Sequence, residues 1–285
     1  MGNLIKAEFR KVITTHLWWA LLIPTFAVGL LFALVTGAMG DALGAGFAEA
    51  PDVAGRFDTG EWEWSVFGFA RSINIATLMP LVFGGCALSG EYSQRTITLT
   101  FLTAPNRTMV LAAKAITYLV WGALYGVVTV IGVSIGLGIS VDSGRLPDAS
   151  GWLAMAGVGV LACVLMTLFG IGIGALIRNT AGTALTLVLY FLLVENGLAL
   201  AFLNDLPSMI GALPNGAING LTGSVAIDIF LSNTTAVSDV LESAVHWFAG
   251  APGAITWWAS ALIFLGWTAL SFGGGWLASR KSDIT

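Results

Sequence analysis

The chain has 285 residues, of which 56% are hydrophobic and only 10% are charged. A soluble globular protein carries about 25% charged residues, so this composition excludes an ordinary water-soluble domain and favours a protein embedded in the lipid bilayer. The formal net charge of −4 also argues against a nucleic-acid partner, which requires a basic face.

The segment 3–16 has two chemically different helical faces. One face is apolar and is formed by Leu4, Ile5, Phe9, Val12 and Ile13. The other face carries Lys6, Glu8, Arg10 and Lys11. This pattern predicts an amphipathic helix in the membrane interface, where basic side chains bind anionic lipid headgroups. The alternative is that these charges only flank the first membrane span.

Six long apolar runs follow, and a spanning helix needs about 20 residues. We expect spans at about 17–39, 66–90, 112–140, 151–177, 180–203 and 254–279. The runs lack the alternation of barrel strands, and the first run is longer than the apolar core of a signal peptide. The predicted fold class is therefore an all-α integral membrane protein, with one transmembrane domain over residues 1–285.

Basic residues in the connections orient the spans, because cytoplasmic loops are enriched in Lys and Arg. Nine of them fall on one side: Lys6, Arg10, Lys11, Arg95, Arg107, Lys114, Arg178, Arg280 and Lys281. Three fall on the other: Arg56, Arg71 and Arg145. We expect the first side, with both termini, to be cytoplasmic, and the protein to cross the cell (plasma) membrane several times.

Two connections are long enough to have a structure or function of their own. The polar segment 91–111 is on the expected cytoplasmic side. The segment 204–253 is on the outer side and is rich in Gly, Pro and Asn. We expect short or re-entrant helices in the outer segment, with one at 221–232.

The cytoplasmic loop has an ordered set of residues. Glu91 follows the second span, and Tyr92, Arg95 and Thr96 come next; Pro105, Arg107 and then Lys114 precede or open the third span. In order and spacing, Glu91, Thr96, Pro105, Arg107 and Lys114 resemble the membrane subunits of ABC-2 type ATP-binding-cassette exporters. Where members of that family often have Gly before the Thr, this chain has Arg95.

The resemblance implies a non-catalytic permease that docks a cytoplasmic ATPase and pairs with a second permease, as a homodimer or heterodimer. ATP and Mg²⁺ would be bound by the ATPase, since the chain has no GxxxxGK[ST] pattern. We therefore expect no catalytic residue, cofactor or metal site here. The residues expected to transmit ATPase motion are Glu91, Tyr92, Arg95, Thr96, Pro105, Arg107, Lys6, Arg10 and Lys11. Glu91 and Arg95 have the i,i+4 spacing of a helical ion pair. The alternative is an ordinary solvated loop.

Glu195 interrupts the fifth apolar run, and an ionisable residue inside a span is costly. Arg71 is at a similar depth near the outer end of the second span, so we expect the two to pair. With Asn74 and Asn196 they are candidates for a translocation route or gate. The alternative is a purely structural ion pair, or a carboxylate that reaches water.

Two other functional classes compete with a permease. A secondary transporter would show an internal repeat and broken helices at mid-membrane. A membrane-embedded enzyme would need clustered polar groups, and the spans offer only Glu195, Asn196 and Asn74. The glycine-rich stretches 132–138 and 170–174 lie in spans, so they predict close helix packing and not phosphate-binding loops.

Overall fold

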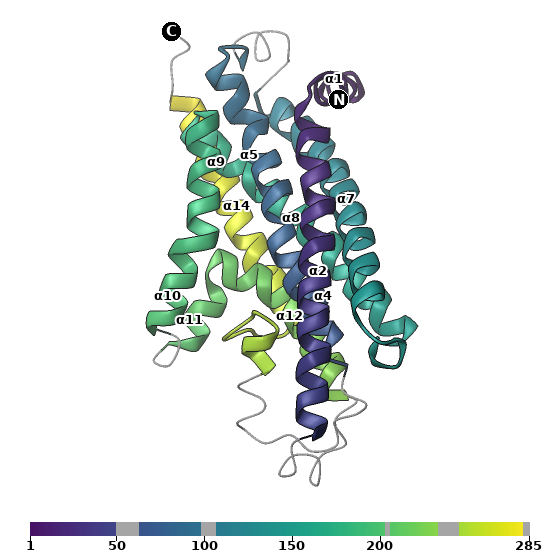
Figure 1. Ribbon diagram of the computed structural model, residues 1–285. Helices are drawn as coiled ribbons and strands as arrows, with labels where there is room; N and C mark the ends of the chain where they lie inside the picture. The colour runs from purple at the N-terminus through teal and green to yellow at the C-terminus, as the bar shows by residue number, and fades with distance from the viewer. Residues whose placement is uncertain (50–62, 98–106, 203–205, 233–244, 282–285) are drawn as a thin grey trace.

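The computed structural model describes residues 1–49, 63–97, 107–202, 206–232 and 245–281, and every regular element in these ranges is helical (Figure 1). Six segments are long and apolar enough to cross a membrane: Leu17–Leu43, Ser65–Ser93, Thr108–Ser140, Ala149–Ile177, Thr180–Phe202 and Trp257–Ala278. The prediction of an all-α membrane protein with six spans is confirmed.

The first half of the chain forms one short helix and four spans. Its elements are α1 (Gly2–Thr14), α2 (Leu17–Glu49), α4 (Ser65–Ala76), α5 (Leu78–Ser93), α7 (Arg107–Ser140), the short 3₁₀ helix η2 (Ser143–Arg145) and α8 (Ala149–Ile177). Helix α1 lies across one end of the bundle, which we call the α1 end (Figure 1). The last turns of α14 (Trp257–Lys281) lie at the same end.

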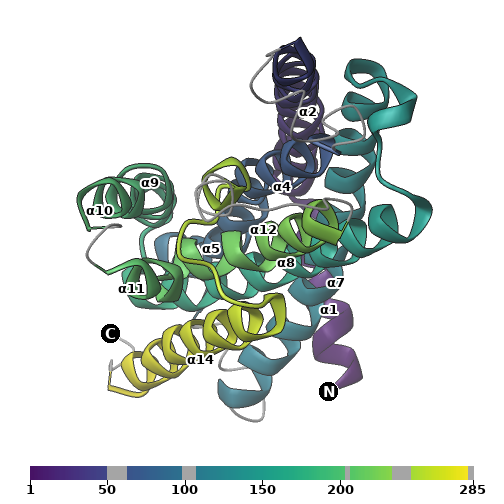
Figure 2. The ribbon, with the colours of Figure 1, turned by 90° about the horizontal axis from the view of Figure 1, so that it is seen from below.

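The fifth span is a composite helix, and two helices follow it before the sixth. It consists of α9 (Thr180–Leu189), the π-helical turn η3 (Tyr190–Val194) and α10 (Glu195–Phe202). The described part of the segment 204–253 contains α11 (Pro207–Ala212) and α12 (Pro214–Ser232). Most of α12 is buried against α4, α8 and α14 (Figure 2), and it begins seven residues before the predicted position.

The second span is broken between α4 and α5 because of a proline. Pro80 has no N–H to donate to the carbonyl of Ala76, and its ring crowds that carbonyl. Helix α4 ends at Ala76, Thr77 forms the joint, and α5 begins at Leu78. One membrane span thus consists of two helical halves, of which α5 is nearer the α1 end.

In the hairpin α8–α9, a side-chain cap marks the start of each helix. Asp148 accepts the N–H of Gly151 at 2.7 Å and begins α8, and this bond holds the pKa of the Asp148 carboxyl below its ordinary value. Arg178 ends α8 in the left-handed conformation, at φ 59°. Asn179 accepts the N–H of Gly182 and begins α9 immediately afterwards. The connection between the two spans is therefore very short.

Helices α5 and α8 pack backbone against backbone. A Cβ on Gly84 would overlap the carbonyl oxygen of Thr167, and a Cβ on Gly170 or Gly174 would overlap a carbonyl of α5. On α7, a Cβ on Gly136 would come within 2.6 Å of a carbonyl of α2. The predicted close packing at the glycine-rich stretches is confirmed.

The outward faces of the bundle are apolar. Exposed large hydrophobic side chains cover α2, α7, α10 and α14, and examples are Leu31, Ile139, Leu200 and Leu270. Such surfaces are unfavourable in water but suit lipid tails or a second membrane subunit.

Candidate functional site

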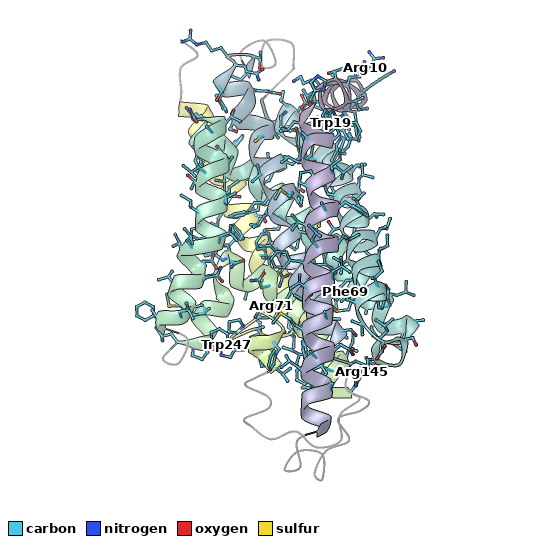
Figure 3. All side chains as sticks on the ribbon, in the orientation of Figure 1. Arg10, Trp19, Phe69, Arg71, Arg145 and Trp247 are labelled. Carbon is cyan, nitrogen blue, oxygen red and sulfur yellow. The ribbon has the colours of Figure 1, made fainter. Side chains whose placement is uncertain are left out.

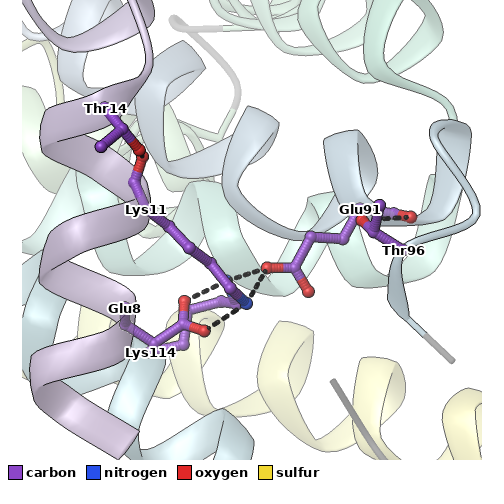
Figure 4. Close-up of polar contacts among 6 residues, drawn as sticks. All are labelled: Glu8, Lys11, Thr14, Glu91, Thr96 and Lys114. Atoms are coloured by element: carbon purple, nitrogen blue, oxygen red, sulfur yellow. Dashed lines mark hydrogen bonds and ion pairs between the residues drawn. The ribbon is translucent and has the colours of Figure 1, made fainter. Parts of the chain in front are cut away.

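Four charged side chains form an ionic cluster at the α1 end (Figure 4). The Nζ of Lys114 on α7 donates to Glu8 Oε2 at 2.6 Å and to Glu91 Oε1 at 2.9 Å. The Nζ of Lys11 donates to Glu8 Oε1 at 2.7 Å and to Glu91 Oε1 at 3.0 Å. Two positive and two negative groups therefore alternate, and they join α1, α5 and α7.

The centre of the ionic cluster is buried. Lys114 is 1% exposed and Glu8 is 4% exposed, whereas Lys11 is exposed at the edge. Burial on its own would raise the pKa of Glu8, but the charge of Lys114 and the hydrogen bonds from Lys11 and Lys114 outweigh it, so the pKa lies below its ordinary value. Removing one partner of such a cluster leaves a buried charge uncompensated.

Helix α1 is docked on the protein through the face that carries the ionic cluster. Glu8, Lys11 and Val12 follow at i, i+3 and i+4, and Val12 is buried in a core shared with α5, α7 and α8. Ile13, in contrast, is 58% exposed. We expected Glu8 on the polar face away from the apolar residues; instead it is buried beside Val12, because Lys114 provides it with a charged partner.

The predicted helical pair of Glu91 and Arg95 is wrong, because α5 ends between them. The N–H of Thr96 donates to the carbonyl of Glu91 at 2.9 Å, and the N–H of Arg95 donates to that of Tyr92 at 3.1 Å. These two bonds form a Schellman C-cap, which needs a left-handed residue at the position of Arg95. Arg95 has φ 58° and so supplies the backbone conformation that Gly usually provides.

The other residues expected to couple to the ATPase have different surroundings. The Arg178 guanidinium lies over the Tyr92 ring at 5.2 Å, which attaches the end of α5 to the end of α8. Lys6 and Arg10 are exposed and line a groove along α1 together with Lys11. Pro105 lies outside the described residues. Arg107 begins α7, but its side chain lies outside the described part.

A cavity of about 400 Å³ lies at the other end of the bundle. It is bordered by α2, α4, η3, α10 and α12, and Figure 2 shows α4 between α2 and α12, with α10 at the left of the view. Its polar lining is Thr36, Arg71, Asn74, Asn196, Asn215 and Asn219. Its aromatic lining is Phe32, Trp64, Phe67, Phe191 and Phe248. Three of the four residues proposed for a gate therefore line one cavity.

Arg71 is held in this cavity by a turn of the chain near Trp247 (Figure 3). Its guanidinium donates to the carbonyl of Trp247 and, at 3.1 Å, to that of Phe248. Those carbonyls belong to the last helical turn before Gly250, and the carbonyl of Trp247 also accepts the N–H of Gly250 at 3.0 Å. Gly250 has φ 72°, and a Cβ there would come within 2.8 Å of the Arg71 side chain.

Glu195 is buried next to the cavity and caps another helix. Its carboxylate accepts the N–H of Asn215 at 2.8 and 2.9 Å and that of Gly216 at 3.1 Å. These are first-turn N–H groups of α12, where a negative charge is favourable. The predicted pair of Arg71 and Glu195 is wrong, because each group is satisfied by backbone of a different part of the segment 204–253.

The π-helical turn η3, directly before Glu195, changes which groups donate hydrogen bonds to the backbone carbonyls beside the cavity. The N–H of Glu195 donates to Tyr190, five residues earlier, as in a π-helix. Asn196 Nδ2 donates to the carbonyls of Phe191 and Leu192, and Asn215 Nδ2 donates to that of Phe191. Such turns are frequent at functional sites.

Sequence reasoning missed Glu8 and the cavity residues Asn215 and Asn219. The only signal for Glu8 was an acid within a basic helix. Asn215 follows Pro214, a residue that favours the first turn of a helix. Neither signal indicates which residue of another helix contacts Glu8 or Asn215.

A family model described as ABC-2 family transporter protein matches residues 2–283. No curated protein matches the chain. The match covers nearly the whole chain, so it includes both the ionic cluster and the cavity.

Proposed function

Since this chain belongs to the ABC-2 transporter family, we propose that it is the permease subunit of an ABC exporter driven by ATPase subunits on separate chains. The α1 end would face the cytoplasm and the ATPase. The cavity would form part of the translocation route, which a second permease, identical or related, completes. ATP and Mg²⁺ would be bound on the ATPase.

The observation that carries this proposal is that one span connects the two sites. Glu91 lies at the end of α5, in the ionic cluster, while Arg71 and Asn74 lie on α4, in the cavity. Asn74 and Glu91 are roughly 25 Å apart along the span at about 1.5 Å per residue. The loop after Glu91 is therefore joined to the cavity by the two halves of one span, through the joint at Thr77.

The ionic cluster gives the ATPase a second point of attachment. Helix α1 is tied to Glu91 and Lys114 by Glu8 and Lys11, so α1 moves together with the ends of α5 and α7. The exposed side chains of Lys6 and Arg10 remain available to an acidic surface of the ATPase. The apolar outward faces would contact membrane lipids.

The decisive experiment measures coupling in a reconstituted complex. The chain is purified with its ATPase in lipid nanodiscs, and ATP hydrolysis is compared for the wild type, Glu91→Gln and Asp142→Asn. Asp142 is an exposed acid at the other end, so its variant is the control. Glu91→Gln should still bind the ATPase but lose most of its effect on hydrolysis. Unchanged hydrolysis in Glu91→Gln would refute the coupling role.

The same preparation separates an exporter from a secondary transporter. Transport should stop when the ATPase carries a substituted P-loop lysine, because ATP hydrolysis then no longer supplies the energy for transport. Transport that continues with the inactive ATPase would assign the chain to the secondary transporters.

A further inference from the structure

The cavity has a net positive character. Arg71 is the one charged residue in its described lining. Three described acids directly neighbour lining residues along the chain, Asp41, Glu63 and Glu195, and none of them is part of the lining. Asp41 pairs with Arg145 at 2.6 Å, and Glu195 is turned to the N-terminal N–H groups of α12. The two carbonyls that accept from Arg71 hold its guanidinium in place without neutralising its charge. A guanidinium has more N–H donors than two carbonyls occupy.

The lining also contains a buried hydrogen-bond donor without a partner among the described residues. Asn74 Oδ1 accepts the hydroxyl of Thr222 at 2.6 Å, while Asn74 Nδ2 has no hydrogen-bond partner in the described part of the chain. A buried donor without a partner is costly. A ligand that brings acceptor oxygens into the cavity would bind the remaining N–H groups of Arg71.

The remaining walls are apolar. Phe32, Leu43, Phe67, Leu78 and Phe191 contribute to the lining, together with further aromatic groups. The volume of about 400 Å³ is in the range of small-molecule sites, about 300–1,000 Å³. A hydrophilic polymer would set its hydroxyl groups against these walls, and a cationic amphiphile would be repelled by Arg71.

We propose that the cavity binds an amphiphile with one anionic head group, a phosphate or a carboxylate, on an apolar body, and that Arg71 binds the head group. Charge-assisted, bidentate hydrogen bonds to a planar guanidinium suit both oxyanions. Identifying this amphiphile as the transported substrate rests on the proposed exporter function; its binding does not.

The test is a head-group series on one chain length. The full chain, without ATPase, is placed in phosphatidylcholine nanodiscs and bound to radiolabelled dodecyl phosphate below its micelle concentration. The competitors are unlabelled dodecyl phosphate, dodecanoate, dodecyl maltoside and dodecyltrimethylammonium. The anionic competitors should displace the label at concentrations at least about tenfold lower than the other two. The order of phosphate and carboxylate identifies the head group.

Three variants locate the preference. Arg71→Gln should remove it, and Arg71→Lys should keep a preference for anions over dodecyltrimethylammonium because the charge remains. Arg145→Gln should behave as wild type, since Arg145 lies at the same end, bonded to Asp41 and outside the cavity. Equal competition by all four head groups would overturn the proposal. So would an unchanged preference in Arg71→Gln, or a lost preference in folded Arg71→Lys.

Failure of this proposal is distinguishable from failure of the exporter function. If head groups compete equally while Glu91→Gln still uncouples ATP hydrolysis, only the ligand class is wrong. If the anions bind through Arg71 but no ATPase responds to the chain, the site stands and the exporter function is wrong.

Discussion

Lys114 on α7 donates to Glu8 on α1 at 2.6 Å across 106 positions of sequence, and the same ammonium binds Glu91 at the end of α5. A helix that the sequence assigns to the membrane surface is thus fixed to two spans by one buried cation. The stability of this attachment and its role in coupling can be tested separately.

Glu8→Gln should destabilise the protein. The substitution removes one of the two carboxylates that compensate the buried Lys114, and the loss of a partner in a buried ion pair costs about 3 kcal/mol. Thermal unfolding in detergent measures the change. The double variant Glu8→Gln/Lys114→Met should lose less stability than the sum of the losses in the two single variants, as expected of interacting residues. Strict additivity would show that the two residues are independent.

The contribution of Glu8 should depend on pH. Its folded-state pKa lies below the ordinary value of 4.5, so its stabilising effect is present above pH 4.5 and is lost as the pH falls through the lowered pKa. The difference in melting temperature between wild type and Glu8→Gln should therefore be constant near neutral pH and shrink below pH 4.5. A difference that does not change with acidification would contradict the ion pairing.

Arg95→Gly should stabilise the end of α5. A residue with a side chain in the left-handed conformation costs about 1 kcal/mol, which glycine avoids. The matched control is Gln94→Gly, since Gln94 has φ −90° and gains nothing from glycine. Thermal unfolding should show a higher melting temperature for Arg95→Gly and a lower one for Gln94→Gly. The reverse order would show that the Arg95 side chain contributes more than the strain costs.

Gly84→Ala should loosen the contact between α5 and α8, because the new methyl group would overlap the carbonyl oxygen of Thr167. Overpacking of this kind costs about 1–3 kcal/mol. Gly157→Ala on α8 is the control, since nothing lies within 4 Å of a Cβ there. That variant should be stabilised by up to about 1 kcal/mol through helix propensity. Similar melting temperatures for the two variants would refute the backbone contact.

Glu195→Gln and Arg71→Gln should have additive effects on unfolding, because the two side chains bind different segments of backbone. Glu195→Gln replaces a carboxylate oxygen with a donor opposite the N–H groups of Asn215 and Gly216. Amide exchange at the start of α12 should therefore accelerate in Glu195→Gln alone. A clear coupling energy between the two substitutions would reinstate the direct pair.

The spans could be predicted because each helix needs, in its own sequence, enough consecutive apolar residues to cross the membrane. The contacts between spans could not be predicted in this way. Glu91 and Lys114 could be recognised by their order and spacing, yet Glu8, the second carboxylate that Lys114 binds, is placed there by the packing of α1 on α5 and α7. Arg71 and Glu195 are at comparable depth along their spans, but equal depth does not determine whether two side chains face each other. Their actual partners belong to turns of the segment 204–253, whose path the sequence does not reveal.

The break at Thr77 has a mechanical consequence. On one side of it, α5 is locked to α8 by contacts that leave no room for a methyl group; on the other side, α4 packs against α2 and α12. A torsional change at this joint can reorient Arg71 and Asn74 without separating α5 from α8. The glycine contact thus fixes α5 against α8, and the hydrogen bond that Pro80 cannot donate leaves Thr77 as the point at which the angle between α4 and α5 can change.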